Sequence, residues 1–410
     1  MIAGMQPLQG IRVVAVEQAV AAPLCTRHLA EMGASIVKIE RPGSGDFARS
    51  YDTVVHGQSS HFVWLNHGKR SLELDLQHAE GRAVFMRLLA ESDVLVSNLG
   101  PGSIDRIVSP EQLEEVNPRL IHCTINGYGY GGSYEQRKAY DLLVQGEAGV
   151  TANTGVPDAP AKPGVSLADL GAGTYALAGI LAALRERDRT GRGARFNISL
   201  FDVVTEWMMP LLLAQRYGGS APQPAGTHHA SIVPYGAFRL ADGTWLNLAV
   251  QNDRQWQAMC RSVLDAEELL DDERFAQNEG RLAAREEIVK LIADRLASMD
   301  PEVLITRLDE TGIPWGRLND LVDVVDHPQL LARDRWRTVK LGASDGPEMV
   351  SLESPLSDLG GTGKTPVVPD LGSDNHEVLT ELGFGDEEIA ALERAGVTGT
   401  TASRNREEAR

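Results

Sequence analysis

The fold is decided by two short apolar runs and the segment between them: Ile11-Arg-Val-Val-Ala-Val16, Pro23–Met32 and Ser35-Ile-Val-Lys-Ile39. The two runs are rich in β-branched residues, which favours strands, and the segment between them has the spacing of a helix. The same alternation continues to Thr124, with a helical pattern over 79–91 and apolar runs at 94–97 and 120–124. Repeated strand–helix–strand order predicts a parallel sheet with right-handed crossovers. We therefore expect an α/β protein whose large domain is Rossmann-like.

The 410 residues are enough for two domains with separate cores. We predict that residues 1–217 form the first part of the large domain. Residues 218–335 are predicted to hold a Gly- and Pro-rich linker and a small α/β domain with a hairpin turned at Asp242-Gly243. Residues 336–398 should return and pack on the large domain, and 399–410 should be a disordered tail. Further helical patterns cover 201–217, 253–264, 281–298 and 375–394.

Acidic residues outnumber basic ones: 57 Asp and Glu stand against 39 Lys and Arg, a net charge of −18. This charge repels nucleic acid phosphates and anionic membrane surfaces, so neither is expected as a partner. The amino terminus lacks the pattern of a signal peptide, and the longest uncharged apolar run is too short to span a bilayer, so we expect a soluble cytoplasmic protein. The three cysteines lack metal or redox spacing and are interpreted as reduced packing residues, and no metal site is expected.

The first strand is not followed by a dinucleotide-binding turn. Residues 17–23 read Glu-Gln-Ala-Val-Ala-Ala-Pro where a glycine-rich phosphate turn would stand, which argues against classical NAD binding. The glycine-rich string at 127–132 lacks the Lys-Ser/Thr of a P-loop and leads into polar residues instead of a helix. We interpret it as a flexible loop.

One carboxylate stands just before an apolar segment that contains glycines. The sequence Lys162-Pro-Gly-Val-Ser-Leu-Ala-Asp169-Leu-Gly171-Ala-Gly173 precedes residues 174–184, which hold no charge and are predicted to form a buried helix. Asp169 would lie at the start of this helix, where the two glycines leave the backbone uncovered and let the carboxylate face a ligand. The structural alternative is that Asp169 is only an N-cap, because Asp favours that position. The pattern alone leaves both interpretations open.

Six segments match one known family in sequence and in order: Leu8-Gln-Gly-Ile-Arg-Val-Val, Gly33–Asp46, Asn66–Asp75, Asn98–Arg106, Ser166–Gly173 and Thr190-Gly-Arg-Gly193. Together they resemble the family III CoA-transferases, the group related to formyl-CoA:oxalate and carnitine CoA-transferases. The resemblance runs over nearly the whole chain. It implies a Rossmann-like fold, an interlaced homodimer, a coenzyme A thioester as substrate and no permanently bound cofactor.

By this resemblance Asp169 is the nucleophile. It would attack the acyl thioester to give a mixed anhydride and CoA thiolate, and an aspartyl-CoA thioester would follow. A carboxylate with the unperturbed pKa of about 3.9 is ionised at pH 7 and needs no general base. The amide of Gly171 is expected to stabilise the oxyanion of the intermediate. The resemblance places the CoA site on Gln18, Ala19, Arg41, Leu74, Asn98, Leu99, Arg106, Lys138 and Tyr140, whose three cations suit a polyphosphate.

Two departures from the oxalate-type pattern bear on the substrate. Val20 stands where those enzymes have a glutamine, and residues 226–238 replace a glycine-rich lid, so oxalate is not expected. Residues 17–27, 227–238 and 249–256 look like the subgroup that contains mesaconyl-CoA C1–C4 CoA-transferase. That subgroup implies CoA transfer between carboxylates of C4–C5 dicarboxylates such as succinate, itaconate and citramalate. Candidates for holding the free carboxylate of such an acid are Arg49, His61, His228 and His229.

Two other functions are weighed against the transferase. The α-methylacyl-CoA racemases share this fold and an aspartate at the position of Asp169, but their second base is a histidine in a Gly-His-Asp string. Here the equivalent residues read Lys138-Ala-Tyr140-Asp141, so a proton relay between two bases lacks its partner. A non-catalytic CoA binder is the other alternative, and it predicts that Asp169→Asn keeps CoA affinity and changes nothing else.

Overall fold

The computed structural model describes residues 5–359 and 364–399. The chain divides into two compact units. Unit 1, as far as it is described, comprises residues 5–148, 164–207, 334–359 and 364–399, and unit 2 comprises 149–163 and 208–333. Two segments that the sequence analysis assigned to the large domain, 149–163 and 208–217, therefore belong to unit 2. Most of the predicted disordered tail lies outside the described residues.

Unit 1 is built on a sheet of six strands that are all parallel, in the order β3-β2-β1-β4-β5-β8. The strands are β1 (Arg12–Val16), β2 (Ser35–Glu40), β3 (Arg70–Glu73), β4 (Val94–Ser97), β5 (Ile121–Asn126) and β8 (Ala194–Ser199). The chain moves outward from β1 to β2 and β3 and then crosses to the other side of β1 with β4. This reversal makes the carboxyl ends of β1 and β4 the switch point of the sheet, where open α/β sheets bind ligands.

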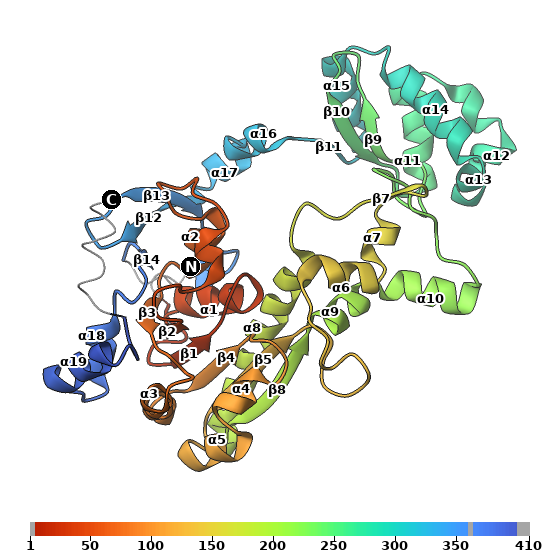
Figure 1. The fold of residues 1–410 in the computed structure, drawn as a ribbon. Helices are drawn as coiled ribbons and strands as arrows, with labels where there is room; N and C mark the ends of the chain where they lie inside the picture. The colour runs from red at the N-terminus through yellow and green to blue at the C-terminus, as the bar shows by residue number, and fades with distance from the viewer. Residues whose placement is uncertain (1–4, 360–363, 400–410) are drawn as a thin grey trace. The chain divides into compact units, whose positions relative to one another are not determined.

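Helices cover both faces of this sheet (Figure 1). On one face, side chains of β1 and β2 share a core with α3 (Ala79–Ala90), α18 (Asn375–Glu381) and α19 (Asp386–Arg394). On the other side of the strands, α1 (Ala21–Glu31) contacts β1 and β4 and packs against α8 (Leu167–Thr190), which also contacts β5 and α9 (Leu200–Trp207). The smaller helices of the unit are α2 (Ser60–Asn66), α4 (Ser103–Ile107), α5 (Pro110–Val116) and α6 (Asp141–Glu147).

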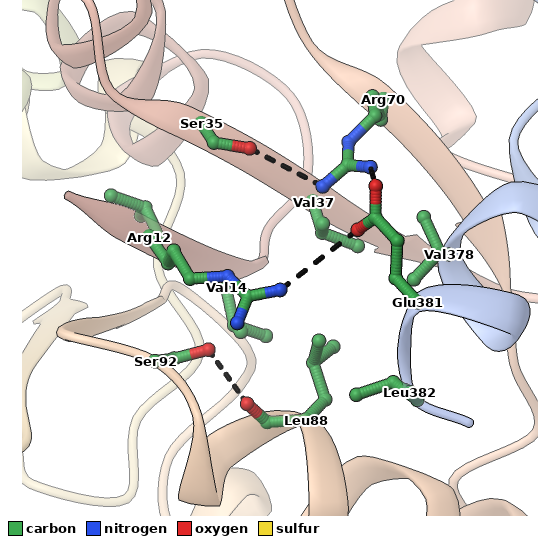
Figure 2. A pocket seen from close by; sticks show the side chains of 11 residues that line it. Arg12, Val14, Ser35, Val37, Arg70, Leu88, Ser92, Val378, Glu381 and Leu382 are labelled. Atoms are coloured by element: carbon green, nitrogen blue, oxygen red, sulfur yellow. Dashed lines mark hydrogen bonds and ion pairs between the residues drawn. The ribbon is translucent and has the colours of Figure 1, made fainter. Parts of the chain in front are cut away.

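The return segment, described over 336–359 and 364–399, packs on the rest of unit 1 in two places. A second sheet, β13-β12-β14, packs on α2 through Phe62 and Val63; its strands are β12 (Trp336–Gly342), β13 (Glu348–Leu352) and β14 (Val367–Pro369). At the amino-terminal edge of the main sheet, Glu381 of α18 lies 2.8 Å from Arg70 and 3.9 Å from Arg12 (Figure 2). These ion pairs tie the return segment to the edge opposite the switch point.

Unit 2 holds a small antiparallel sheet, β11-β10-β9. The predicted hairpin is present, because β9 (Tyr235–Arg239) pairs with β10 (Trp245–Ala249) across the turn at Asp242-Gly243. A separate core forms around Trp256, Ile288 and Leu304. Further elements are α7 (Val150–Asn153), β6 (Gly155–Val156), β7 (Ala159–Pro160), α10 (Met209–Gly218), α11 (Asp253–Ala258), α12 (Glu273–Ala276), α13 (Asn278–Ala283), α14 (Arg285–Leu296), α15 (Pro301–Thr311), β11 (Trp315–Arg317), α16 (Leu321–Val325) and α17 (Pro328–Ala332).

Several predicted helices are divided in the structure. The pattern over 201–217 breaks at Met208 because Pro210 stands in the first turn of α10, where its missing N–H is harmless. The pattern over 253–264 continues beyond α11 as a π-helix, Met259–Val263. The remaining two patterns are divided into α13 and α14, and into α18 and α19.

Helix α8 is longer than the predicted buried segment. It has 24 residues, and by length and composition it is the one helix among the described residues that could span a membrane. Its packing against α1, α9 and β5 accounts for this apolar composition, since a core helix has the same character.

Candidate active site

Most of the predicted CoA-binding residues directly follow strands of the unit 1 sheet. Because the carboxyl ends of parallel strands lie at one edge, these residues lie along the edge that contains the switch point. Gln18 and Ala19 follow β1, Arg41 follows β2, Leu74 follows β3, and Asn98 and Leu99 follow β4, whereas Arg106 lies on α4 and Lys138 and Tyr140 lie between β5 and α6.

The side chain of Asn98 joins the two strands of the switch point. Its Oδ1 accepts a hydrogen bond from the backbone N–H of Gln18 (2.8 Å), and its Nδ2 donates to the carbonyl of Gln18 (2.7 Å). The next residue, Ala19, has a φ of 61°, a left-handed conformation that is uncommon outside glycine. The side-chain amide of Asn98 therefore uses these hydrogen bonds to hold the loop after β1 in place.

Three cations of the predicted CoA site are exposed. The side chains of Arg41 and Lys138 make no hydrogen bond or ion pair with any described residue, and Arg106 bonds only the Ser103 hydroxyl, at 2.9 Å. A cation without a carboxylate partner is available to phosphate. Leu74 differs, because its side chain is 2% exposed and belongs to the core, so it has no free side-chain surface for a ligand.

Asp169 lies inside the first turn of α8, as the third helical residue after Ser166. The cap is supplied by Asp141, whose Oδ1 accepts hydrogen bonds from the backbone N–H groups of Ala168 (2.8 Å) and Asp169 (3.3 Å). The N-cap interpretation of Asp169 is therefore wrong. Its carboxylate makes no hydrogen bond with any residue in the described part of the chain.

The electrostatic setting of Asp169 differs from the sequence expectation. Burial, with a smaller contribution from the negative charge of Asp141, raises the pKa of Asp169 to about 7. The pKa of Asp169 is therefore not the unperturbed value on which the expectation of an ionised carboxylate rests. The phenol of Tyr51 lies close by: burial first, then the charges of Asp46 and Asp169, raise its pKa above the ordinary value.

The packing of α8 places Asp169 beside the loop after β1. Leu170 lies in one small apolar cluster with Ala19, Val20 and Leu24. One turn later, a Cβ added to Gly173 would lie 2.5 Å from the carbonyl oxygen of Ala21, so the first turn of α1 approaches the α8 backbone closely. The unpaired carboxylate thus lies next to the switch point.

The two glycines near Asp169 are packing residues. Gly171 and Gly173 are both buried, so the expectation of uncovered backbone is wrong. A Cβ on Gly171 would lie 2.6 Å from the Trp207 ring and 2.7 Å from Val203, both on α9. The amide of Gly171 lies beyond the first turn, where helical N–H groups bond the preceding turn, so an oxyanion role for it has no support here.

Within residues 5–359 and 364–399, no group of three or more His, Cys, Asp or Glu side chains is arranged to hold a metal ion.

The family model for CoA-transferase family III matches residues 8–375. The chain belongs to CoA-transferase family III. Its enzyme class is therefore that of a transferase, and its α/β fold with a parallel sheet is the fold of solved relatives.

Known proteins resemble this family III CoA-transferase over most of its length. An acetyl-CoA:oxalate CoA-transferase from Acetobacter aceti is 34% identical over 331 residues, covering 80% of this chain and 85% of the relative. A succinate–glutarate CoA-transferase from Agrobacterium fabrum is 33% identical over 390 residues, covering 92% and 96%. The crystal structure of a CAIB/BAIF family protein from Brucella suis has a TM-score of 0.77 at 32% identity, covering 92% of this chain and 99% of that chain.

The predicted substrate residues of this family III CoA-transferase have different surroundings. The guanidinium of Arg49 already has a carboxylate partner: its Nε and one terminal nitrogen donate to the two oxygens of Glu40, at 2.9 and 2.7 Å, and it lies over the Phe62 ring. His61 is exposed, 4.0 Å from Asp52, and its ring meets the edge of Tyr51 at 5.4 Å. The structure leaves His61 accessible to a ligand in unit 1.

The histidine pair lies in unit 2. His229 stacks on Tyr235, with ring centroids 5.1 Å apart, and its Nδ1 accepts a hydrogen bond from Ser231. His228 has a buried Nδ1 without a hydrogen-bond partner among the described residues, and burial lowers its pKa.

Sequence reasoning missed two residues beside Asp169. Asp141 was noted only as part of the string that argues against a racemase, and nothing in its spacing shows that it caps a helix 27 residues away. Tyr51 lies in a segment without periodicity, so no pattern pointed to it. Both were detectable only from the tertiary packing of α6 and α8 and of the loop after β2.

Proposed function

We propose that this enzyme transfers CoA between carboxylates of short dicarboxylic acids of four or five carbons, with Asp169 as the covalent nucleophile. The observation that carries the proposal is the carboxylate of Asp169, partly buried, free of hydrogen bonds within the described residues and placed beside the switch point of the sheet. A buried acid without a partner is costly, and such groups concentrate at functional sites.

The reaction balances with the side chain of Asp169 and the two substrates alone. An Asp169 oxygen attacks the thioester carbonyl, the C–S bond breaks, and CoA leaves as thiolate with a mixed anhydride on the enzyme. The thiolate attacks the aspartyl carbonyl, which releases the first acid as a carboxylate and leaves an aspartyl-CoA thioester. The acceptor carboxylate then attacks that thioester, the C–S bond breaks, and a second mixed anhydride forms between the acceptor and Asp169. The released thiolate attacks the acceptor acyl carbon of this anhydride and displaces Asp169 as a carboxylate.

The exposed cations suit the charges of these substrates. The CoA phosphates would bind at the sheet edge to Arg41, Arg106 and Lys138. An acidic protein needs such a local cluster of positive charge to bind a polyphosphate. His61 and Tyr51 would face the acid beside Asp169. The two similar transferases named above act on oxalate and on succinate and glutarate, all dicarboxylates. Val20 leads us to propose a C4–C5 acid, either of the mesaconyl-CoA C1–C4 type or with succinyl-CoA as donor.

The setting of the enzyme completes the proposal. We place its activity in the cytoplasm. Its three cysteines are buried and free, as expected in a compartment that keeps thiols reduced. We also propose an interlaced homodimer. Exposed apolar side chains on α16, Leu321 at 82% and Val322 at 77%, are consistent with a surface that a second copy covers.

A panel assay tests the function. The protein is incubated with CoA thioesters of succinate, mesaconate, glutarate and oxalate, with and without free acceptor acids, and hydroxylamine or borohydride trapping is followed by peptide mass analysis. We expect exchange with C4–C5 acids and modification at Asp169. Asp169→Asn should abolish both and keep CoA affinity, whereas Asp188→Asn, an exposed acid at the far end of α8, should change neither.

Three results would contradict the proposal. Exchange without any label on Asp169 would disprove the covalent mechanism. Solvent deuterium uptake at the α-carbon without an acceptor would indicate a racemase, and CoA binding with no turnover of any thioester would indicate a binder.

A further inference from the structure

The loop after β1 has a conformation that needs support. Ala19 has a φ of 61°, in the left-handed region that is sterically unfavourable for a residue with a Cβ. The loop lies beside the reacting carboxylate, because Leu170 packs with Ala19 and Val20. A strained backbone of this kind persists only where its surroundings hold it in place.

Asp46 holds the loop by a direct hydrogen bond. Its Oδ1 accepts from the backbone N–H of Ala19 at 3.1 Å and from that of Ala48 at 2.9 Å. Asp46 itself is fixed, since its own N–H donates to Glu40 Oε1 at 3.0 Å and its side chain is fully buried. A residue after β2 thus determines the backbone after β1.

Lys38 connects Asp46 to the other end of the same loop. Its Nζ donates to Asp46 Oδ2 at 2.9 Å and to the backbone carbonyl of Glu17, the residue before Gln18, at 3.3 Å. Burial lowers the pKa of Lys38, but the charges of Glu17 and Asp46 outweigh this effect and leave the pKa above its ordinary value. The buried ammonium is therefore charged and bound at both ends of the loop.

We propose that Lys38 and Asp46 are positioning residues for the transfer reaction: their buried ion pair fixes Ala19 in its left-handed conformation and so sets the place of the Gln18–Ala19 backbone relative to the Asp169 carboxylate. The inference rests on the proposed function, because it matters for turnover only if Asp169 reacts. Neither side chain contacts the Asp169 carboxylate, so both act through the loop. A displaced loop would hold the thioester away from the nucleophile, and this affects kcat more than KM.

Variants at Asp46 and Ala19 separate this role from general stability. Asp46→Ala removes both hydrogen bonds and should lower kcat on the order of a hundredfold with little change in KM. Asp46→Asn should keep only part of the activity, because its amide oxygen can still accept the two N–H groups while its NH2 group, a donor only, replaces the oxygen that pairs with Lys38. Adding Ala19→Gly to Asp46→Ala should recover kcat several-fold, because glycine adopts a positive φ without strain.

The matched control is Glu31→Gln, in another buried ion cluster of unit 1. Glu31 bonds Arg27 at 3.1 Å and Arg337 at 2.5 Å and has no contact with the β1 loop among its hydrogen bonds and ion pairs in the described chain. It should lower the melting temperature and keep the wild-type kcat. Thermal melting of every variant accompanies the kinetics and the trapping of Asp169.

The outcomes distinguish the inference from the function. Wild-type turnover without acylation of Asp169 would overturn the proposed function and this inference with it. Acylated wild type together with a normal kcat for Asp46→Ala would overturn the inference alone. A loss in Asp46→Ala that Ala19→Gly does not recover, and that Glu31→Gln shares at equal destabilisation, would also overturn it.

Discussion

Replacing Asp169, the proposed nucleophile, by its neutral isostere Asn should stabilise the protein. The pKa of Asp169 stands at about 7 against an ordinary 3.8, a difference of about three pH units, mainly because burial disfavours the charged form. A difference of one pKa unit corresponds to about 1.36 kcal/mol, so ionisation of Asp169 costs the folded state up to about 4 kcal/mol. The side chain is partly exposed, and hydration reduces this figure, so we expect Asp169→Asn to raise the free energy of unfolding by roughly 2 kcal/mol at pH 8.

The raised pKa also predicts how the stability difference between Asp169→Asn and wild type changes with pH. A carboxyl group with a raised pKa in the folded state binds its proton more tightly there than in the unfolded chain. Stability is therefore lost as pH rises from about 4 to about 7 and stays constant above that range. The Asn variant lacks this loss, so its advantage over wild type should be full at pH 8 and should shrink as pH falls toward 4.

Thermal melting at pH 5, 6.5 and 8 measures the effect. For a unit of this size, 2 kcal/mol corresponds to a rise in Tm of roughly 4 to 8 °C. Asp188→Asn, on the same helix but exposed, controls for the loss of one negative charge. An Asp169→Asn variant no more stable than wild type at pH 8, or equally stabilised at every pH, would refute the claim that the ionised nucleophile is held at a cost.

Three further predictions follow from individual contacts. Asp141→Asn keeps the cap on α8 through its amide oxygen and removes a charge that raises the pKa of Asp169, so the midpoint of the kcat/KM profile against pH should move below its wild-type position. Arg41→Ala should raise KM for the CoA thioester roughly tenfold at low salt and less at high salt, whereas Arg12→Ala at the opposite sheet edge should leave KM unchanged. Glu31→Gln should lower the free energy of unfolding by roughly 3 kcal/mol in urea titrations at pH 7, because Arg27 stays buried without a carboxylate and the half-buried Arg337 loses the same partner.

The fold was accessible from the sequence where local patterns and global topology agree. The runs at 11–16 and 35–39 are rich in β-branched residues, buried in the structure beyond their first residues and joined by a helix, so the parallel pairing follows from chain connectivity. The division of the chain was less accessible. The helical pattern over 201–217 is continuous in hydrophobicity, and only Pro210 indicates that a new helix begins there, in unit 2.

The sequence singles out Asp169 but does not reveal the contacts around it. Asp169 stands out because a carboxylate before an apolar, glycine-containing run is unusual, and the structure places it beside the switch point. The functions of Gly171 and Arg49 were not visible, because each depends on a partner far along the chain: Trp207 for the glycine and Glu40 for the arginine. The sequence alone does not distinguish a glycine that makes room for a ligand from one that makes room for a neighbouring helix.

The burial that destabilises the ionised Asp169 favours the reaction proposed for it. The mixed anhydride and the aspartyl thioester are both uncharged at this side chain, so acylation removes the charge that burial disfavours. The carboxylate is also more basic than an exposed one, since its pKa is raised to about 7, and a more basic oxygen is a better nucleophile. A salt bridge to Asp169 would remove both advantages. Arg49, two residues before Tyr51, is bound to Glu40 and therefore does not neutralise Asp169. If Asp169 is acylated as proposed, the folded state gives up stability at one carboxylate that the reaction then uses.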